Sequence, residues 1–238
     1  MDVDAISAHI KGFLKKHQQV FYSLSTNQSK ALELAVAVGV AEHYRYKGYA
    51  VEIANPTKTP NQFVVKTGTR GYPWNFSRIN LSRNDNTFEA HLNLLARSAH
   101  DQGRYCVDVG IVNSGSVPTK GTKKSWDCAS NSDLVTFAEV KKLFVYPMLL
   151  AQFLGIVHEI KPQFINETVS DQFMEEDHLL PTLASLGPFS GNSKNIVEAY
   201  PTRGIRVVIA QNFDVRLANL RGGKISSPFE DESAGLNV

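Results

Sequence analysis

The sequence has few cysteines and no long apolar run. Its 238 residues contain only Cys106 and Cys128, and neither stands in CxxC or Cys/His ligand spacing. Two isolated thiols exclude a disulfide-stapled scaffold and argue against a structural zinc site. No stretch approaches the about 20 apolar residues of a membrane span, and the acidic start MDVDAISAHI does not resemble a secretory signal. We therefore expect a soluble, cytoplasmic protein that does not use a membrane as a partner.

Several sequence motifs of catalysis are also missing. The chain has no GxxxxGK[ST] phosphate loop, no GxSxG nucleophile elbow and no HExxH pair, which removes the enzyme classes that depend on them. The net charge is only +2, yet basic residues outnumber acidic ones in residues 1–142 and the reverse holds in 143–238. A basic first half is compatible with a polyanionic partner, although such an excess is also common on solvated surfaces.

The remaining composition is typical of one globular domain. With 42% hydrophobic and 20% charged residues, a chain of this length can bury a core without disulfide or metal staples. We predict a single domain over residues 1–221. Residues 222–238 (GGKISSPFEDESAGLNV) are small, polar and acidic, and we predict a disordered tail there.

Hydrophobic periodicity predicts the secondary structure. Apolar residues at helical spacing indicate helices over 3–22, from about 25 to 47 with Gly48 ending it, and over 145–160. Residues 163–203 show a weak pattern, which predicts part helix and part irregular surface. Apolar or alternating runs predict seven strands: 50–55, 62–68, 75–83, 88–98, 105–113, 134–140 and 203–211. The order predicts an α/β fold, with a mixed central sheet flanked by helices.

Two predicted strands each contain a carboxylate among apolar residues. Asp108 lies within YCVDVGIV, and Glu139 ends the run VTFAE. An unpaired carboxylate in a buried strand costs several kcal/mol, so each acid needs a partner. If the two strands are neighbours, the carboxylates converge and repel each other unless a cation lies between them. A divalent ion such as Mg²⁺ prefers oxygen ligands of this kind.

A lysine accompanies the second carboxylate. Lys141 follows Glu139 by two residues, so on an extended strand both side chains point to the same face. There its ammonium group could orient a water molecule and stabilise negative charge on a phosphate. The competing interpretation is structural: an E-x-K pair can be a surface salt bridge, and a lone Asp in a strand can cap a neighbouring helix.

The order of Asp108, a connecting loop, and Glu139-Val140-Lys141 at the end of an apolar strand resembles the signature of the PD-(D/E)xK nuclease superfamily. The resemblance covers the order of elements over about residues 29–211 and implies a restriction endonuclease-like core. It implies that Asp108 and Glu139 hold Mg²⁺, with Mn²⁺ as the alternative ion and the Val140 carbonyl as a further ligand. Val107 stands where the superfamily often has proline, and the strands over 50–83 exceed its minimal core.

The superfamily often adds a carboxylate from its first core helix. Glu33 and Glu42 are both available there, and the apolar neighbours of Glu33 make it the better candidate. Glu89, on the strand before Asp108, is the other contender, and His91 lies on the same strand face. For each of these residues a purely structural role is the alternative.

The loop between the two carboxylate strands is long and basic. Lys120, Lys123 and Lys124 precede Trp126 there, and Lys142 follows the catalytic candidate Lys141. Lysines beside an aromatic residue can contact a phosphate backbone and a base, although such loops are often merely solvated.

The sequence thus predicts a metal-dependent endonuclease that hydrolyses phosphodiester bonds, most plausibly in DNA, in a restriction, repair or phage-defence setting. The alternative is a noncatalytic nucleic-acid-binding or assembly module with the same fold. Nucleases that cut both strands of a duplex are often dimers, so a homodimer is one option that the sequence leaves open.

Overall fold

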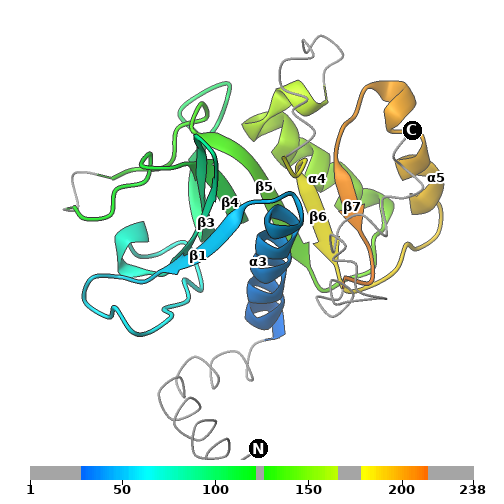
Figure 1. The fold of residues 1–238 in the computed structure, drawn as a ribbon. Helices are drawn as coiled ribbons and strands as arrows, with labels where there is room; N and C mark the ends of the chain where they lie inside the picture. Colours follow the sequence, from blue (N-terminus) through cyan, green and yellow to red (C-terminus); the bar gives the residue numbers. More distant parts are fainter. Residues whose placement is uncertain (1–27, 122–125, 166–177, 214–238) are drawn as a thin grey trace, which may run out of the picture.

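Seven strands form one mixed sheet within residues 28–121, 126–165 and 178–213, the parts of the chain that the computed structural model describes (Figure 1). The spatial order follows the chain order from β1 to β7. Strands β1 to β5 pair antiparallel, and β5, β6 and β7 pair parallel. The strands are β1 (Ala50–Ala54), β2 (Arg78–Arg83), β3 (Asn86–Arg97), β4 (Arg104–Asn113), β5 (Leu134–Lys141), β6 (Thr182–Ser185) and β7 (Val208–Ala210).

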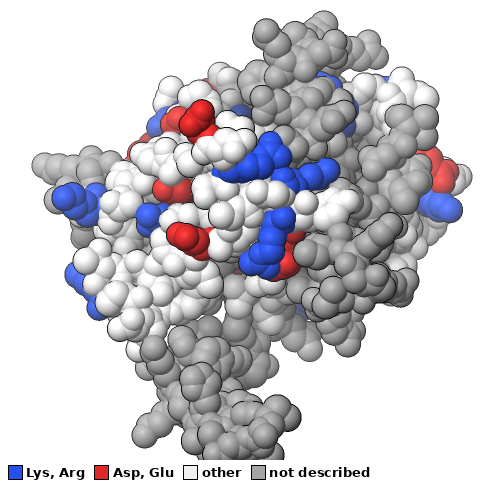
Figure 2. Space-filling model, in the orientation of Figure 1, with Lys and Arg blue, Asp and Glu red and all other residues white. Residues whose placement is uncertain are grey.

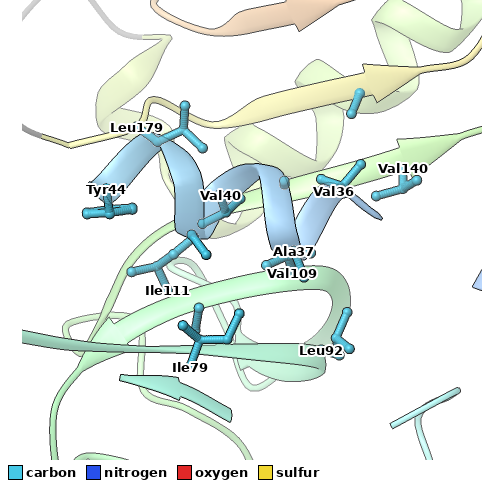
Figure 3. Packing of buried hydrophobic residues seen from close by; sticks show 14 of the residues in the cluster. Val36, Ala37, Val40, Tyr44, Ile79, Leu92, Val109, Ile111, Val140 and Leu179 are labelled. Atoms are coloured by element: carbon cyan, nitrogen blue, oxygen red, sulfur yellow. The ribbon is translucent and has the colours of Figure 1, made fainter. Parts of the chain in front are cut away.

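Helix α3 (Gln28–Tyr46) packs on one face of the sheet (Figure 3). Val36, Val40 and Tyr44, spaced four apart and so on one side of the helix, are fully buried. They belong to the same apolar cluster as Val109 and Ile111 of β4. This packing fixes the helix, and every polar side chain that it carries, over the middle of the sheet.

The carboxyl end of α3 is set by a glycine, as the sequence predicts. Gly48 takes a φ of 86°, a backbone conformation that side chains disfavour. The Tyr49 N–H then returns to the Tyr44 carbonyl at 2.9 Å, which satisfies one of the last helical carbonyls. The chain is thereby turned directly into β1.

Helices α4 (Pro147–Ile160) and α5 (Ser193–Glu198) pack on the opposite face. Phe137 and Ala138 are neighbours on β5 but belong to the two different apolar clusters, as the alternation of a strand requires. Short 3₁₀ turns η1 (Pro73–Asn75), η2 (Pro162–Phe164) and η4 (Pro201–Arg203) each begin with proline. The result is a sheet with helices on both faces.

Most of the predicted elements are confirmed, and two predictions are wrong. The strand predicted over 203–211 is confirmed only as the three residues of β7, because the 3₁₀ turn η4 and the positive φ of Gly204 (67°) occupy its predicted start. Residues 62–68 form no strand, because the backbone of Val64 is hydrogen-bonded to Ser77 rather than to a neighbouring strand. The Val64 N–H donates to the Ser77 hydroxyl at 2.7 Å, and the Ser77 N–H donates to the Val64 carbonyl at 2.9 Å. Strand β6 lies in the region predicted to be part helix and part irregular. The predicted helix over 3–22 and the tail over 222–238 lie outside the described residues. Among the helices of the described ranges, none has the length and apolar content that crossing a membrane takes.

Candidate active site

The two carboxylates meet where β4 and β5 separate. The antiparallel pairing of these strands ends at the pair Val109 and Ala138. Asp108 and Glu139 occupy the next position in the same register, just past the last pair. On its other edge, β5 pairs with β6 from Ala138 to Lys141. The Val140 N–H donates to Asp108 Oδ2 at 2.8 Å, so a side chain satisfies a backbone group next to the point of separation. The condition under which the two carboxylates would converge, that their strands are neighbours, is met.

Glu139 is the more buried of the two acids. Its side chain is only 6% exposed, against 19% for Asp108. Its Oε2 accepts a hydrogen bond from Lys141, whereas its Oε1 is buried and has no hydrogen-bond partner within the part of the chain that the structure describes. A buried acceptor of this kind costs free energy unless a donor or a cation satisfies it.

Lys141 joins the two carboxylates. Its Nζ lies 2.9 Å from Glu139 Oε2 and 3.8 Å from Asp108 Oδ2. The Lys141 side chain is 36% exposed, so the ammonium lies at the boundary between the buried pair and solvent. The expectation that Glu139 and Lys141 point to the same face is confirmed.

The surroundings of the three groups shift their protonation equilibria. Burial, together with the nearby Asp108 carboxylate and partly offset by Lys141, raises the pKa of Glu139 to about 7. Burial also raises the pKa of Asp108, against the opposing effects of Lys141 and the Val140 N–H. Burial acts to lower the pKa of Lys141, but Glu139 and Asp108 outweigh it and raise the pKa overall. Two carboxylates with raised pKa values beside one ammonium group form an arrangement typical of functional sites.

Helix α3 contributes a third acid to the same neighbourhood. Glu33 is 6% exposed, and its charge acts to raise the pKa of both Asp108 and Lys141. Lys30 pairs with it at 2.6 Å, and Asn93 Nδ2 donates to its Oε2 at 2.8 Å. Glu33 therefore lies close to the pair but is held by other partners.

Asn93 links Glu33 to a buried lysine. On β3 the flanking residues Leu92 and Leu94 pair with Val109 and Val107, which places Asn93 opposite Asp108. The Asn93 carbonyl accepts from Lys66 Nζ at 2.6 Å, and its amide donates to the Lys66 carbonyl at 3.0 Å. Asn93 adopts a φ of 49°, which is uncommon for a residue other than glycine.

Glu89 belongs to a different cluster. It pairs with Val112 on β4 and lies four residues from Asn93, roughly 13 Å along the strand. His91 Nε2 lies 3.0 Å from Glu89 Oε2, and the guanidinium of Arg78 lies 3.4 Å from the same oxygen. Of the three upstream acids considered, Glu42 pairs with Arg45, and the structure brings Glu33 and not Glu89 to the neighbourhood of Asp108.

Glu89 also holds the start of the basic loop. Its Oε1 accepts from the Gly115 N–H at 3.3 Å and from the Ser114 hydroxyl at 3.4 Å. Lys120 is exposed further along this loop, while Lys123 and Lys124 lie outside the described residues. Trp126 is half-buried against the core under α4, so its ring is partly committed to packing.

The described basic residues on one face of the molecule are mixed with acidic ones. Lys142 is exposed directly beside Lys141. On the face that Figure 2 presents, Lys and Arg lie interspersed with Asp and Glu rather than in one extended stripe. Within residues 28–121, 126–165 and 178–213, no group of three or more His, Cys, Asp and Glu side chains is arranged to hold a metal ion. Two converging carboxylates, Asp108 and Glu139, are therefore what the described part of the site offers.

Sequence reasoning missed three residues of this neighbourhood: Lys30, Lys66 and Asn93. For each of them the sequence contains a feature that could have drawn attention to the residue. Lys30 precedes Glu33 by three residues, the spacing of a helical ion pair. Asn93 interrupts the apolar run HLNLLA, and Lys66 interrupts QFVVKTG.

Compared with protein-family models, curated protein sequences and solved structures, the chain gives no match. The roles considered for these residues therefore rest on the geometry and chemistry of the side chains.

Proposed function

We propose that the protein is a metal-dependent nuclease with a restriction endonuclease-like core, and that it hydrolyses phosphodiester bonds in DNA. The observation that carries this proposal is the meeting of Asp108, Glu139 and Lys141 at the point where β4 and β5 separate. In hydrolysis, a water oxygen bonds to phosphorus, the bond to one ester oxygen breaks, and that oxygen leaves with a proton.

A divalent cation fits the donor set. The buried Oε1 of Glu139 has no hydrogen-bond partner within the described residues, and the nearby Asp108 carboxylate adds to the effect of burial in raising the pKa of Glu139. Asp108 and Glu139 would hold Mg²⁺ or Mn²⁺, with the Val140 carbonyl as a further oxygen ligand and Glu33 completing the acidic cluster. When bound, such an ion supplies Lewis acidity to the phosphoryl oxygens and lowers the pKa of a coordinated water.

The chain's own residues have separate roles in this proposal. Lys141 positions the attacking water, because its ammonium lies at the solvent boundary beside both carboxylates. Lys142 and Lys120, both exposed, contact the phosphate backbone. The Val140 N–H keeps Asp108 aimed at Glu139 by its 2.8 Å hydrogen bond.

One observation favours a second candidate. Within the described residues the acidic cluster stops at two converging carboxylates, and Glu33 is engaged by Lys30 and Asn93. A noncatalytic nucleic-acid-binding module with this fold would show the same partners, because Lys141 then neutralises the pair permanently.

The experiment that separates the two candidates is cleavage of plasmid DNA and of labelled single-stranded DNA with Mg²⁺, Mn²⁺ or EDTA. The nuclease proposal expects cleavage that needs the metal and is lost in Glu139→Ala and Lys141→Ala. Glu42→Gln and Lys194→Ala change a carboxylate and a lysine in helical ion pairs away from the site, so both should cut normally. DNA binding without cleavage under any metal would favour the binding module.

A further inference from the structure

Three large apolar side chains are exposed beside the candidate active site. Leu143, Phe144 and Leu186 are 49%, 60% and 45% exposed, and together we call them the apolar ledge. The segments that carry them are joined by backbone hydrogen bonds, because the Leu186 N–H donates to the Lys141 carbonyl at 3.1 Å and the Gly187 N–H to the Leu143 carbonyl at 3.3 Å.

The backbone beneath Phe144 is fixed although its ring is exposed. A side chain at Gly187 would approach the Phe144 Cα to 2.8 Å, so the two segments touch at a point where only glycine fits. Val145, the next residue, is fully buried in the core under α4. The exposed ring is therefore carried by a backbone that is already fixed, so binding need not order this segment of the chain.

The apolar ledge lies close in sequence to the catalytic candidate Lys141. Phe144 follows Lys141 by three residues, a reach of about 10 Å at most. Lys142, which is also exposed, lies between them in the sequence, so a basic residue and an aromatic residue are exposed on the same short segment. That combination fits a nucleotide, whose phosphate pairs with lysine while its base stacks on the ring.

The alternatives fit the ledge less well. A protein partner or a second copy of this chain needs about 20–30 residues on each side, which three half-exposed side chains do not supply. In a paired duplex each base is covered on both faces by its neighbours, so only an unpaired base can stack on the ring. We propose that the apolar ledge stacks an unpaired nucleobase beside the scissile phosphate, so that the enzyme acts on single-stranded or locally unpaired DNA.

The position of the scissile phosphate rests on the proposed function, but the stacking can be tested without cleavage. Binding of a fluorescein-labelled single strand and of a fully paired duplex is measured by anisotropy in EDTA. Phe144→Ala should weaken single-strand binding about tenfold and leave duplex binding unchanged. Phe144→Tyr should bind as the parent protein does, whereas Phe144→Leu, apolar but not aromatic, should resemble Phe144→Ala.

Ile53→Ala is the matched control, because Ile53 is 61% exposed on β1, which β2, β3 and β4 separate from β5. It should bind both DNAs normally, and unfolding temperatures should match across all variants. Equal losses on single strand and duplex, full binding by Phe144→Leu, or no binding of either DNA would overturn the ledge proposal. A dimer that Phe144→Ala dissociates would assign the ledge to a second copy and overturn it too.

Cleavage assays on the same proteins separate the two proposals. If binding depends on the Phe144 ring but no metal-dependent cleavage occurs, the stacking proposal is supported and the proposed nuclease activity is refuted. Cleavage of single strands and duplexes with the same efficiency by the parent protein and Phe144→Ala would support the nuclease and refute the ledge.

Discussion

At the residue scale, the ionisation of Glu139 works against folding. Its pKa is raised from an ordinary 4.5 to about 7, so the folded chain binds this proton more tightly than the unfolded chain does. The resulting stabilisation is complete below pH 4.5 and is lost as the pH rises through about 7. A group kept under such strain is typical of a functional site rather than of a structural salt bridge.

Glu139→Gln should therefore raise the unfolding free energy in alkali, by up to about 3 kcal/mol, because it removes a buried charge beside Asp108. The gain should vanish well below pH 4.5, where Glu139 is protonated in both the folded and the unfolded state. Urea unfolding across this pH range measures it, with the half-exposed Glu42→Gln as control. A variant less stable than the parent protein at every pH would show that the Lys141 ion pair dominates instead.

Asn93 is a positioning residue for Glu33. Asn93→Ala removes the hydrogen bonds to Glu33 and Lys66 and forces alanine into a φ of 49°, so it should cost about 2–4 kcal/mol of unfolding free energy. Asn93→Gly loses the same hydrogen bonds without the backbone strain and should cost about 1 kcal/mol less. Urea unfolding compares them.

Both Asn93 variants should also cut DNA more slowly in the nuclease assay, because Glu33 is then held by Lys30 alone. Equal stability of the glycine and alanine variants would argue that no strain is stored at this position. Normal cleavage by both would show that the orientation of Glu33 is irrelevant to the chemistry.

At the element scale, Glu89 illustrates how one carboxylate can fix a whole loop. Its polar and charged partners offset the free-energy cost of burying the carboxylate. Burial alone would raise the pKa of Glu89, but His91, Arg78 and the Gly115 N–H outweigh it and lower the pKa. Its stabilising effect is therefore present above its ordinary pKa of 4.5 and is lost as the pH falls through the lowered value.

Glu89→Gln should lower the unfolding free energy by about 1–3 kcal/mol near neutral pH, and the loss should shrink in acid. Hydrogen exchange at the Gly115 amide should become faster, because its acceptor is weakened, while DNA cleavage persists. Lost cleavage with unchanged stability and exchange would place Glu89 in the catalytic machinery after all.

The elements that sequence predicted well are those with strong local periodicity. Strand β3 and strand β4 are long and apolar, and helix α3 carries its own glycine stop, so local pattern was enough. Strand β6 was missed because it is four residues long and buried on both sides, with no alternation to detect. It exists only because β5 and β7 pair with it, which no local signal records.

The residues of the candidate site also fall into those that a local sequence pattern predicts and those that depend on long-range pairing. Asp108, Glu139 and Lys141 stand on periodic strands, so their convergence could be predicted from spacing. The choice between Glu33 and Glu89 could not, because it depends on strand register: Asn93, not Glu89, lies opposite Asp108. The αL backbone of Asn93 and its bonds to Lys66 join residues far apart in sequence, and only the folded chain brings them together.

At the scale of the whole molecule, charge is mixed over the face seen in Figure 2, so a basic first half of the sequence does not become one basic face there. On that face the described part of the protein therefore offers no extended basic surface that would attract DNA over a long range. Its specificity would instead depend on contacts near Lys141 and Lys142, where the apolar ledge begins.

The last prediction concerns the metal and needs no substrate. A divalent ion that binds the folded chain alone stabilises it by mass action, by about 2.7 kcal/mol at a hundredfold excess over its dissociation constant. Mg²⁺ or Ca²⁺ should therefore raise the unfolding temperature at neutral pH. The rise should be absent in Glu139→Gln and Asp108→Asn and intact in Glu42→Gln.

This shift should also weaken in acid, because the ion must displace the proton that Glu139 holds with a pKa of about 7. A rise of equal size in all variants would mean that the ion acts elsewhere on the surface. No rise in the parent protein would favour the interpretation in which Lys141 alone neutralises the two carboxylates, and with it the binding module over the nuclease.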